Sequence, residues 1–105
     1  MPQGRPGCII AAACYQDRLF DARVRALNKQ AILTWRARFR AMFEEISVKY
    51  PARQPVDLND LADMVSSAVE GGIILSKALN EPQAVGRQVM QLRTYVKLLF
   101  SANVD

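Results

Sequence analysis

The sequence predicts an all-α fold, and three observations support this class. The five prolines, at positions 2, 6, 51, 55 and 82, all lie outside the stretches with helical periodicity. Between them, apolar residues recur every three or four positions, as on one face of a helix. No stretch shows the sustained alternation that is typical of a strand. With 105 residues, the chain has the length of one domain.

Two helices are expected before Pro51. A loop over residues 1–7 precedes a short helix over 8–17, which is rich in alanine, the best helix former. The second helix is expected over 21–49, with Asp21 as its N-cap. Its apolar residues form one stripe along the whole helix: Val24, Leu27, Ala31, Trp35, Phe39, Met42 and Ile46.

The third helix is expected over 58–79, with Asp57 able to cap its N-terminus. Its apolar arc covers about 220° of the circumference at 3.6 residues per turn. A helix on the surface of a domain needs a stripe of only about 100°. This helix therefore packs against two neighbours, and in so short a chain we expect the second neighbour to belong to another subunit.

The fourth helix is expected over 82–102, followed by a tail at 103–105. Pro82 suits a first helical turn, and Asn80 is the candidate N-cap. Residues 8–102 are thus interpreted as a single domain of four antiparallel helices. The apolar stripe of the fourth helix consists of Val85, Val89, Leu92, Val96, Leu99 and Phe100.

Composition and charge narrow the class of protein. Half of the residues are hydrophobic, which argues against disorder, and the net charge of +4 is modest for a dedicated nucleic-acid binder. Cys8 and Cys14 are six positions apart and point in different directions on a helix, so they cannot form a disulfide with each other. The apolar run between them is too short to cross a bilayer. We therefore expect a cytoplasmic protein that does not associate with membranes.

The sequence offers little for catalysis or for binding of metals and cofactors. It contains no histidine, so no Ser-His-Asp or Cys-His arrangement can form. Two cysteines that face different directions do not make a zinc site. The neighbouring carboxylates, such as Asp57 and Asp60, are interpreted as helix caps or solvated side chains. We expect neither an enzyme nor a cofactor or metal site.

Several segments, taken in order, resemble the C-terminal domain of TetR/AcrR-type transcription repressors. A "Gly-Cys-aliphatic" helix start is followed by a long basic helix with a central tryptophan, and then by an aspartate with a Leu-Ala pair. A glycine-containing aliphatic run, an Asn-Glu-Pro break and a closing helix complete the pattern. These segments are Arg5–Ile10, Thr34–Phe39, Val56–Ala62, Val69–Ala78, Asn80–Pro82 and Gln91–Val96.

The resemblance implies a domain that binds a small effector and forms a homodimer. In this family the last two helices pair with those of a second subunit as a four-helix bundle. Gly71 and Gly72 would let two helix backbones approach closely, either at that interface or within one subunit. The residues expected at the interface are Leu61, Val65, Ala68, Gly71, Gly72, Leu75, Leu79, Val89, Leu92 and Val96.

The chain departs from the family at its N-terminus, where we expect no helix-turn-helix and hence no DNA binding by this chain alone. We also expect no counterpart of the helices that connect head and effector domain in the family, so Ile32 and Phe43 are expected to be exposed or covered by another copy. A pocket for a small apolar effector is expected at Cys14, Tyr15, Trp35, Phe39 and Met42.

Other readings of the same residues stay open. The chain could be a stand-alone helical interaction module, for example a headless partner that forms inactive mixed dimers with a full-length regulator. A small enzyme is a further alternative, which the lack of histidine disfavours. The basic face of the second helix is interpreted as a solvated surface, with contact to phosphates as the alternative. That face consists of Arg25, Lys29, Arg36 and Arg40.

Overall fold

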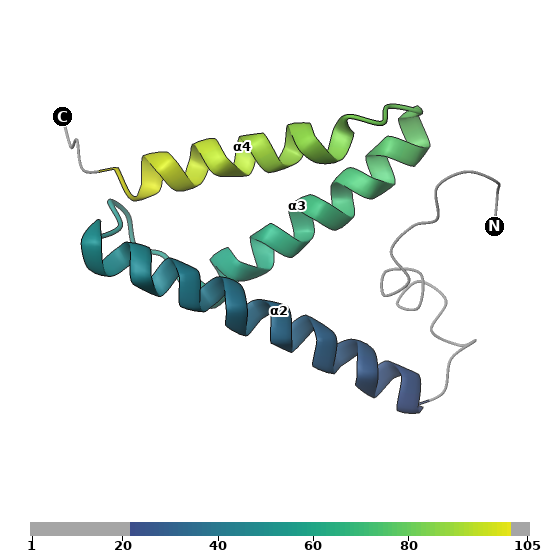
Figure 1. Ribbon diagram of the computed structural model, residues 1–105, viewed down its shortest axis with the longest axis horizontal. Coiled ribbons are helices and arrows are strands. Elements are labelled where there is room, and N and C mark those ends of the chain that lie inside the picture. The colour runs from purple at the N-terminus through teal and green to yellow at the C-terminus, as the bar shows by residue number, and fades with distance from the viewer. Residues whose placement is uncertain (1–21, 102–105) are drawn as a thin grey trace.

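A computed structural model describes residues 22–101, and this part of the chain is entirely helical (Figure 1). Its elements are α2 (Ala22–Lys49), α3 (Leu58–Leu79) and α4 (Ala84–Leu99). No strand occurs within the described residues, which confirms the all-α class there. The helix predicted over 8–17 and the tail predicted over 103–105 lie outside the described residues.

The helix bounds largely match those expected from the sequence. α3 has the expected bounds, and α2 is helical from Ala22, the first described residue, to the expected end at Lys49; Asp21, its expected N-cap, lies outside the described residues. α4 is shorter than the expected 82–102: it begins at Ala84 and ends at Leu99. Pro82 lies in the turn before α4 instead of in its first helical turn, so the prediction at that end was wrong by two residues.

The two ends of α3 are capped in different ways. The carboxylate of Asp57 accepts a hydrogen bond from the backbone N–H of Asp60 at 2.9 Å, as an N-cap should. Asn80 does not cap α4, contrary to the prediction. It ends α3 in the left-handed conformation, with φ 55°, and its N–H bonds to the carbonyl of Ser76. Asparagine tolerates this conformation better than most residues, so the same side chain suits a helix C-terminus.

The three helices form a flat zigzag in which α3 lies between the other two (Figure 1). α4 folds back along α3, and the C-terminal half of α2 crosses the beginning of α3. The N-terminal half of α2 extends away from both. The Cα extents are 50 × 33 × 16 Å, and the radius of gyration is 16.2 Å. A compact domain of similar length has a radius of about 12–13 Å. Few side chains can therefore be enclosed on all sides.

The main core lies at the closed end of the zigzag, where all three helices meet. It joins Phe43 of α2, Leu61 of α3, Leu99 of α4 and the adjoining Phe100. The rings of Phe43 and Phe100 stack with centroids 6.3 Å apart and planes inclined by 14°. The loop after α2 is fastened to this core because the N–H of Arg53 donates to the carbonyl of Leu99 at 2.8 Å. That bond also satisfies a carbonyl at the C-terminus of α4.

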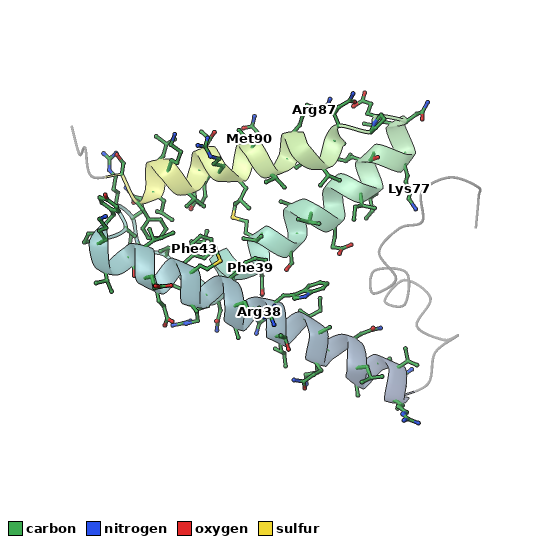
Figure 2. All side chains as sticks on the ribbon, in the orientation of Figure 1. Arg38, Phe39, Phe43, Lys77, Arg87 and Met90 are labelled. Atoms are coloured by element: carbon green, nitrogen blue, oxygen red, sulfur yellow. The ribbon has the colours of Figure 1, made fainter. Side chains whose placement is uncertain are left out.

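Phe43 corrects one prediction about α2. It was expected to be exposed or covered by another copy, yet it is buried in the core of its own chain. Ile32 is half-buried. Figure 2 shows Phe39 and Phe43 on the side of α2 that faces α3. The reason is that α2 crosses the start of α3 and that Phe100 stacks on Phe43, so residues of the same chain cover this side of α2.

Candidate interaction surface

Large apolar side chains remain exposed on all three helices. On α3, Leu79 keeps 56% of its surface exposed and Met64 41%. On α4, Leu98 is 62% exposed, and Figure 2 shows Met90 on the side of α4 that points away from α3. Monomeric proteins seldom expose many such side chains close together, and where they do the surface is often an interaction site.

The wide apolar arc of α3 divides into a covered part and an open part. One part packs inside the chain through Leu61, Ala62 and Gly72, which are buried. The other part is a stripe that repeats with steps of four and three residues, which is the spacing of helix-packing positions. Its members are exposed or half-buried. We call this stripe the α3 seam, and it consists of Met64, Ala68, Gly71, Leu75 and Ala78.

Gly71 and Gly72 have different surroundings. A Cβ atom on Gly72 would lie 2.7 Å from the Cα of Val85, so Gly72 permits the close approach of α3 and α4 within one chain. A Cβ atom on Gly71 would have no heavy atom within 4 Å. Of the two uses expected from the sequence, contact within one subunit therefore holds for Gly72. Gly71 lies in the open α3 seam.

The ten residues expected at a dimer interface fall into three groups. Leu61, Gly72 and Leu92 are buried within their own chain, so they are not accessible to a second subunit. Leu75, Leu79 and Val89 are exposed and free to meet a partner. The remaining four are half-buried: Val65, Ala68, Gly71 and Val96. The expected interface omitted Met64 and Ala78, although both belong to the α3 seam. Their spacing of four and three residues from Ala68 and Leu75 is the signal that could have found them.

The residues expected to line an effector pocket are only partly brought together. Phe39 packs against the core, Trp35 is half-buried, and Met42 is 54% exposed. Cys14 and Tyr15 lie outside the described residues. The described residues therefore place Phe39 in the core and Met42 at the surface, and a shared pocket stays a prediction.

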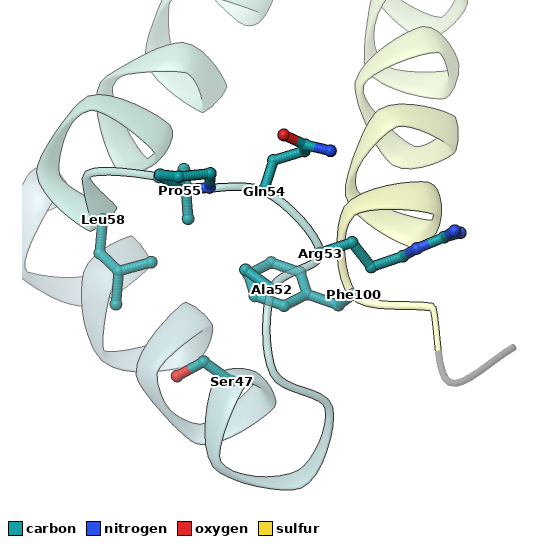
Figure 3. Close-up of a pocket in the computed structure, with 8 residues that line it drawn as sticks. Ser47, Ala52, Arg53, Gln54, Pro55, Leu58 and Phe100 are labelled. Atoms are coloured by element: carbon teal, nitrogen blue, oxygen red, sulfur yellow. The ribbon is translucent and has the colours of Figure 1, made fainter. Parts of the chain in front are cut away.

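Two shallow hollows occur elsewhere on the described part of the chain. One, of about 520 Å³, lies where the loop after α2 meets Phe100, with Ser47, Pro55 and Leu58 on its rim (Figure 3). The other, of about 600 Å³, runs along the outer side of α4 beside Gly86 and Met90. Both open widely to solvent, whereas sites for small molecules usually enclose most of the ligand. Neither hollow contains Trp35, Phe39 or Met42.

The charged groups of α2 mostly serve contacts within the chain. Arg36 donates from Nε and Nη2 to the two carboxylate oxygens of Asp63 on α3, at 2.9 and 2.8 Å. This paired hydrogen bond lowers the pKa of Asp63 below its ordinary value. Arg40 donates to Glu44 on the same helix at 3.2 Å. Arg36 and Arg40 of the expected basic face are thus engaged by carboxylates, which favours the interpretation as a solvated surface.

The described residues do not form a group of three or more potential ligands that could hold a metal ion. Glu70 has one carboxylate oxygen that is buried without a hydrogen-bond partner, but a single carboxylate does not make a metal site. None of the described helices combines the length and the apolar character needed to cross a membrane. The exposed apolar surface of α3 and α4 is therefore the strongest candidate for a functional surface.

Comparisons with protein-family models, with curated proteins and with solved structures each find no match to this chain. The resemblance to TetR-type regulators thus depends on the sequence segments quoted above. The candidate function must be argued from the surface chemistry of the three helices.

Proposed function

We propose that this chain is a homodimerisation module, of the kind found in the C-terminal effector domain of TetR-like repressors. The observation that carries the proposal is the open half of the apolar arc on α3. Met64, Leu75 and Ala78 are exposed there and Ala68 and Gly71 are half-buried, so the described helices cover this stripe only in part. Removing apolar surface from water contributes roughly 25 cal/mol per Å², which favours a second subunit as the cover.

A symmetric dimer is the simplest arrangement that covers such a stripe. In a twofold interface the same patch is used by both subunits, so one exposed stripe is enough to close the assembly. α3 and the neighbouring α4 then supply the two helices from each subunit that form a bundle. The exposed residues Leu79 and Val89 extend the apolar surface along these helices.

In a repressor, this dimer would hold two DNA-binding heads at the spacing of two operator half-sites. A small apolar effector that binds one arrangement of the helices more tightly would shift the population of head spacings. The half-buried Trp35 of α2 is the group that would report such binding by its fluorescence. Neither of the two hollows described above encloses such an effector.

A fusion protein tests the dimerisation function in a cell. The full chain would be joined to a helix-turn-helix head that represses a reporter gene only when two heads are held together. The expected result is repression that is lost on Leu75→Glu, since a charge in the apolar stripe opposes its burial. Leu27→Glu, a change at an exposed position of α2, is the matched control and should keep repression. A stable, folded fusion that never represses the reporter would contradict the proposal.

The alternative function is that of a headless partner, which forms mixed dimers with a full-length regulator. It uses the same surface of α3 and α4, so the solution mass of this chain alone does not distinguish it. Co-expression of this chain with a full-length regulator from the same genome does. Mixed dimers that fail to bind operator DNA would favour the alternative, whereas exclusive homodimers would favour the proposed function.

A further inference from the structure

We propose that the two subunits meet by antiparallel packing of α3 on its symmetry mate, with the crossing point at Gly71. The proposal rests on the proposed dimerisation, and it adds the residues that touch and their register. The α3 seam runs from Met64 to Ala78, a length of about 21 Å at 1.5 Å per residue. It combines three small residues with two large ones, all of them uncharged.

The order of large and small residues in the α3 seam is self-complementary. When the helix is turned end to end about Gly71, Met64 comes opposite Ala78 of the second copy. Leu75 comes within one residue of the level of Ala68, an offset of about 1.5 Å along the helix, and Gly71 meets its own mate. Each large side chain then faces a small one, which lets the two helices interdigitate without gaps.

A parallel arrangement of the two helices lacks this complementarity. It would set Met64 against Met64 and Leu75 against Leu75, with Ala68 and Gly71 leaving an unfilled space between them. It would also bring the acidic N-terminal ends of the helices together, where Asp57 and Asp60 lie. Like charges placed opposite each other oppose association, so the charge distribution favours the antiparallel arrangement.

Gly71 fits a helix crossing better than it fits a role within its own chain. It lies in the middle of α3, where glycine is less favourable than alanine. Its own chain leaves space for a Cβ atom, in contrast to Gly72. A second helix backbone that approaches Gly71 would use this space, as it does at other close helix crossings.

The flat shape of the described residues favours a second copy of this chain as the occupant. Their Cα extents are 50 × 33 × 16 Å, and Met64, Leu75 and Leu79 stay exposed at the surface. A standard interface buries roughly 800 Å² on each partner, and in a twofold dimer the same apolar stripe of both subunits contributes to it.

A series of glycine substitutions in the full chain tests the crossing point. Gly71→Ala and Gly86→Ala both replace a helical glycine that has space for a Cβ atom, so both should preserve or raise the helix content. In sedimentation equilibrium, Gly71→Ala should weaken dimerisation by at least about tenfold. Gly71→Leu should abolish it while circular dichroism stays helical. Gly86→Ala, on α4, should leave the dissociation constant unchanged.

Disulfide cross-linking tests the register. In a background with Cys8→Ser and Cys14→Ser, Gly71→Cys should form a covalent dimer on mild oxidation, because two symmetry-related residues at a crossing come within disulfide distance. Gly86→Cys should not. Dimers that resist Gly71→Leu, or that cross-link only at position 86, would overturn this register and leave the dimerisation itself intact. A chain that stays monomeric in its unmodified form would overturn both.

Discussion

The two adjacent glycines of α3 differ in their surroundings, and a substitution at Gly72 tests the packing of α3 against α4 within the chain. Its ideal Cβ atom would lie 2.7 Å from the backbone Cα of Val85, which cannot move away as a flexible side chain could. We therefore expect Gly72→Ala to lower the free energy of unfolding by about 1–3 kcal/mol, the usual cost of overpacking. Urea unfolding of Gly72→Ala and of Gly86→Ala, a helical glycine outside the α3 seam that has space for a Cβ atom, measures it. Equal stability of the two variants would contradict the close approach of α3 and α4.

Leu61 is the residue through which the core connects the three helices. Only 2% of its surface is exposed, and it lies in one cluster with Phe43 and Leu99. Leu61→Ala should lower the free energy of unfolding by about 2–4 kcal/mol, as for other large-to-small changes in a core. Leu27→Ala, at a position 63% exposed, should change it by less than about 0.5 kcal/mol. A comparable loss in both variants, measured by thermal or urea unfolding, would contradict this location of the core.

At the scale of single residues, sequence reasoning succeeded where the chemistry of one side chain decides the role of that residue. Asp57 precedes an apolar-periodic segment, and its carboxylate caps α3 as expected. Asn80 was assigned to the wrong helix because asparagine suits both an N-cap and a left-handed C-cap. Phe43 was expected at the surface because its burial depends on where α2 crosses α3, and no local pattern encodes that crossing.

At the scale of helices, the contact of α2 with α3 should depend on pH through Arg36 and Asp63. The folded state lowers the pKa of Asp63 below its ordinary value of 3.8, chiefly through the hydrogen bond from Arg36. The stabilisation is therefore complete above that ordinary value, and it is lost as the pH falls through the lower pKa of the folded state. Because both side chains are more than one-third exposed, the effect is small and weakens with added salt.

Asp63→Asn isolates this contribution. The difference in free energy of unfolding between the unmodified chain and Asp63→Asn should be constant near neutral pH. It should shrink as the pH falls below 3.8, measured by urea unfolding at low ionic strength. A difference that grows on acidification, or that ignores salt, would contradict the assigned role of this ion pair. The two proteins differ only at position 63, so the comparison isolates the contribution of this side chain.

The helices themselves could be predicted well because periodicity and proline positions mark them. The bounds of α3 agree with the expected ones, and α2 ends at the expected residue, Lys49. The ends of α4 were placed too far out because its apolar stripe continues through Phe100 after the helix has ended. The single stripe expected along α2 is packed only in its second half, where Phe39 and Ile46 contact the core.

At the scale of the whole molecule, the sequence showed that α3 has too much apolar surface for one neighbour, but not which part each neighbour covers. A helical wheel gives the direction of Leu61 and Leu75, yet it cannot say which of them faces α4. In the structure Leu61 is enclosed and Leu75 is exposed. The exposure of each side chain thus divides the apolar arc of α3 into a part that packs within the chain and the α3 seam.

Because the three helices lie in one flat layer, the chain is expected to associate with a second copy of itself. A 16 Å thick zigzag encloses one small core and leaves Met64, Leu75 and Leu79 at its surface. Two such layers, stacked by a twofold axis, would bury these residues and thicken the molecule to the dimensions of an ordinary domain. Stability should then rise with protein concentration, since a dimer that dissociates on unfolding follows mass action.

Sedimentation equilibrium of the full chain, from micromolar to submillimolar concentration, tests this claim most directly. We predict a monomer–dimer equilibrium whose upper limit is twice the chain mass of 11.8 kDa, with no larger species because a twofold interface is closed. A mass that stays at that of one chain throughout the range, while circular dichroism shows a folded helical protein, would contradict it.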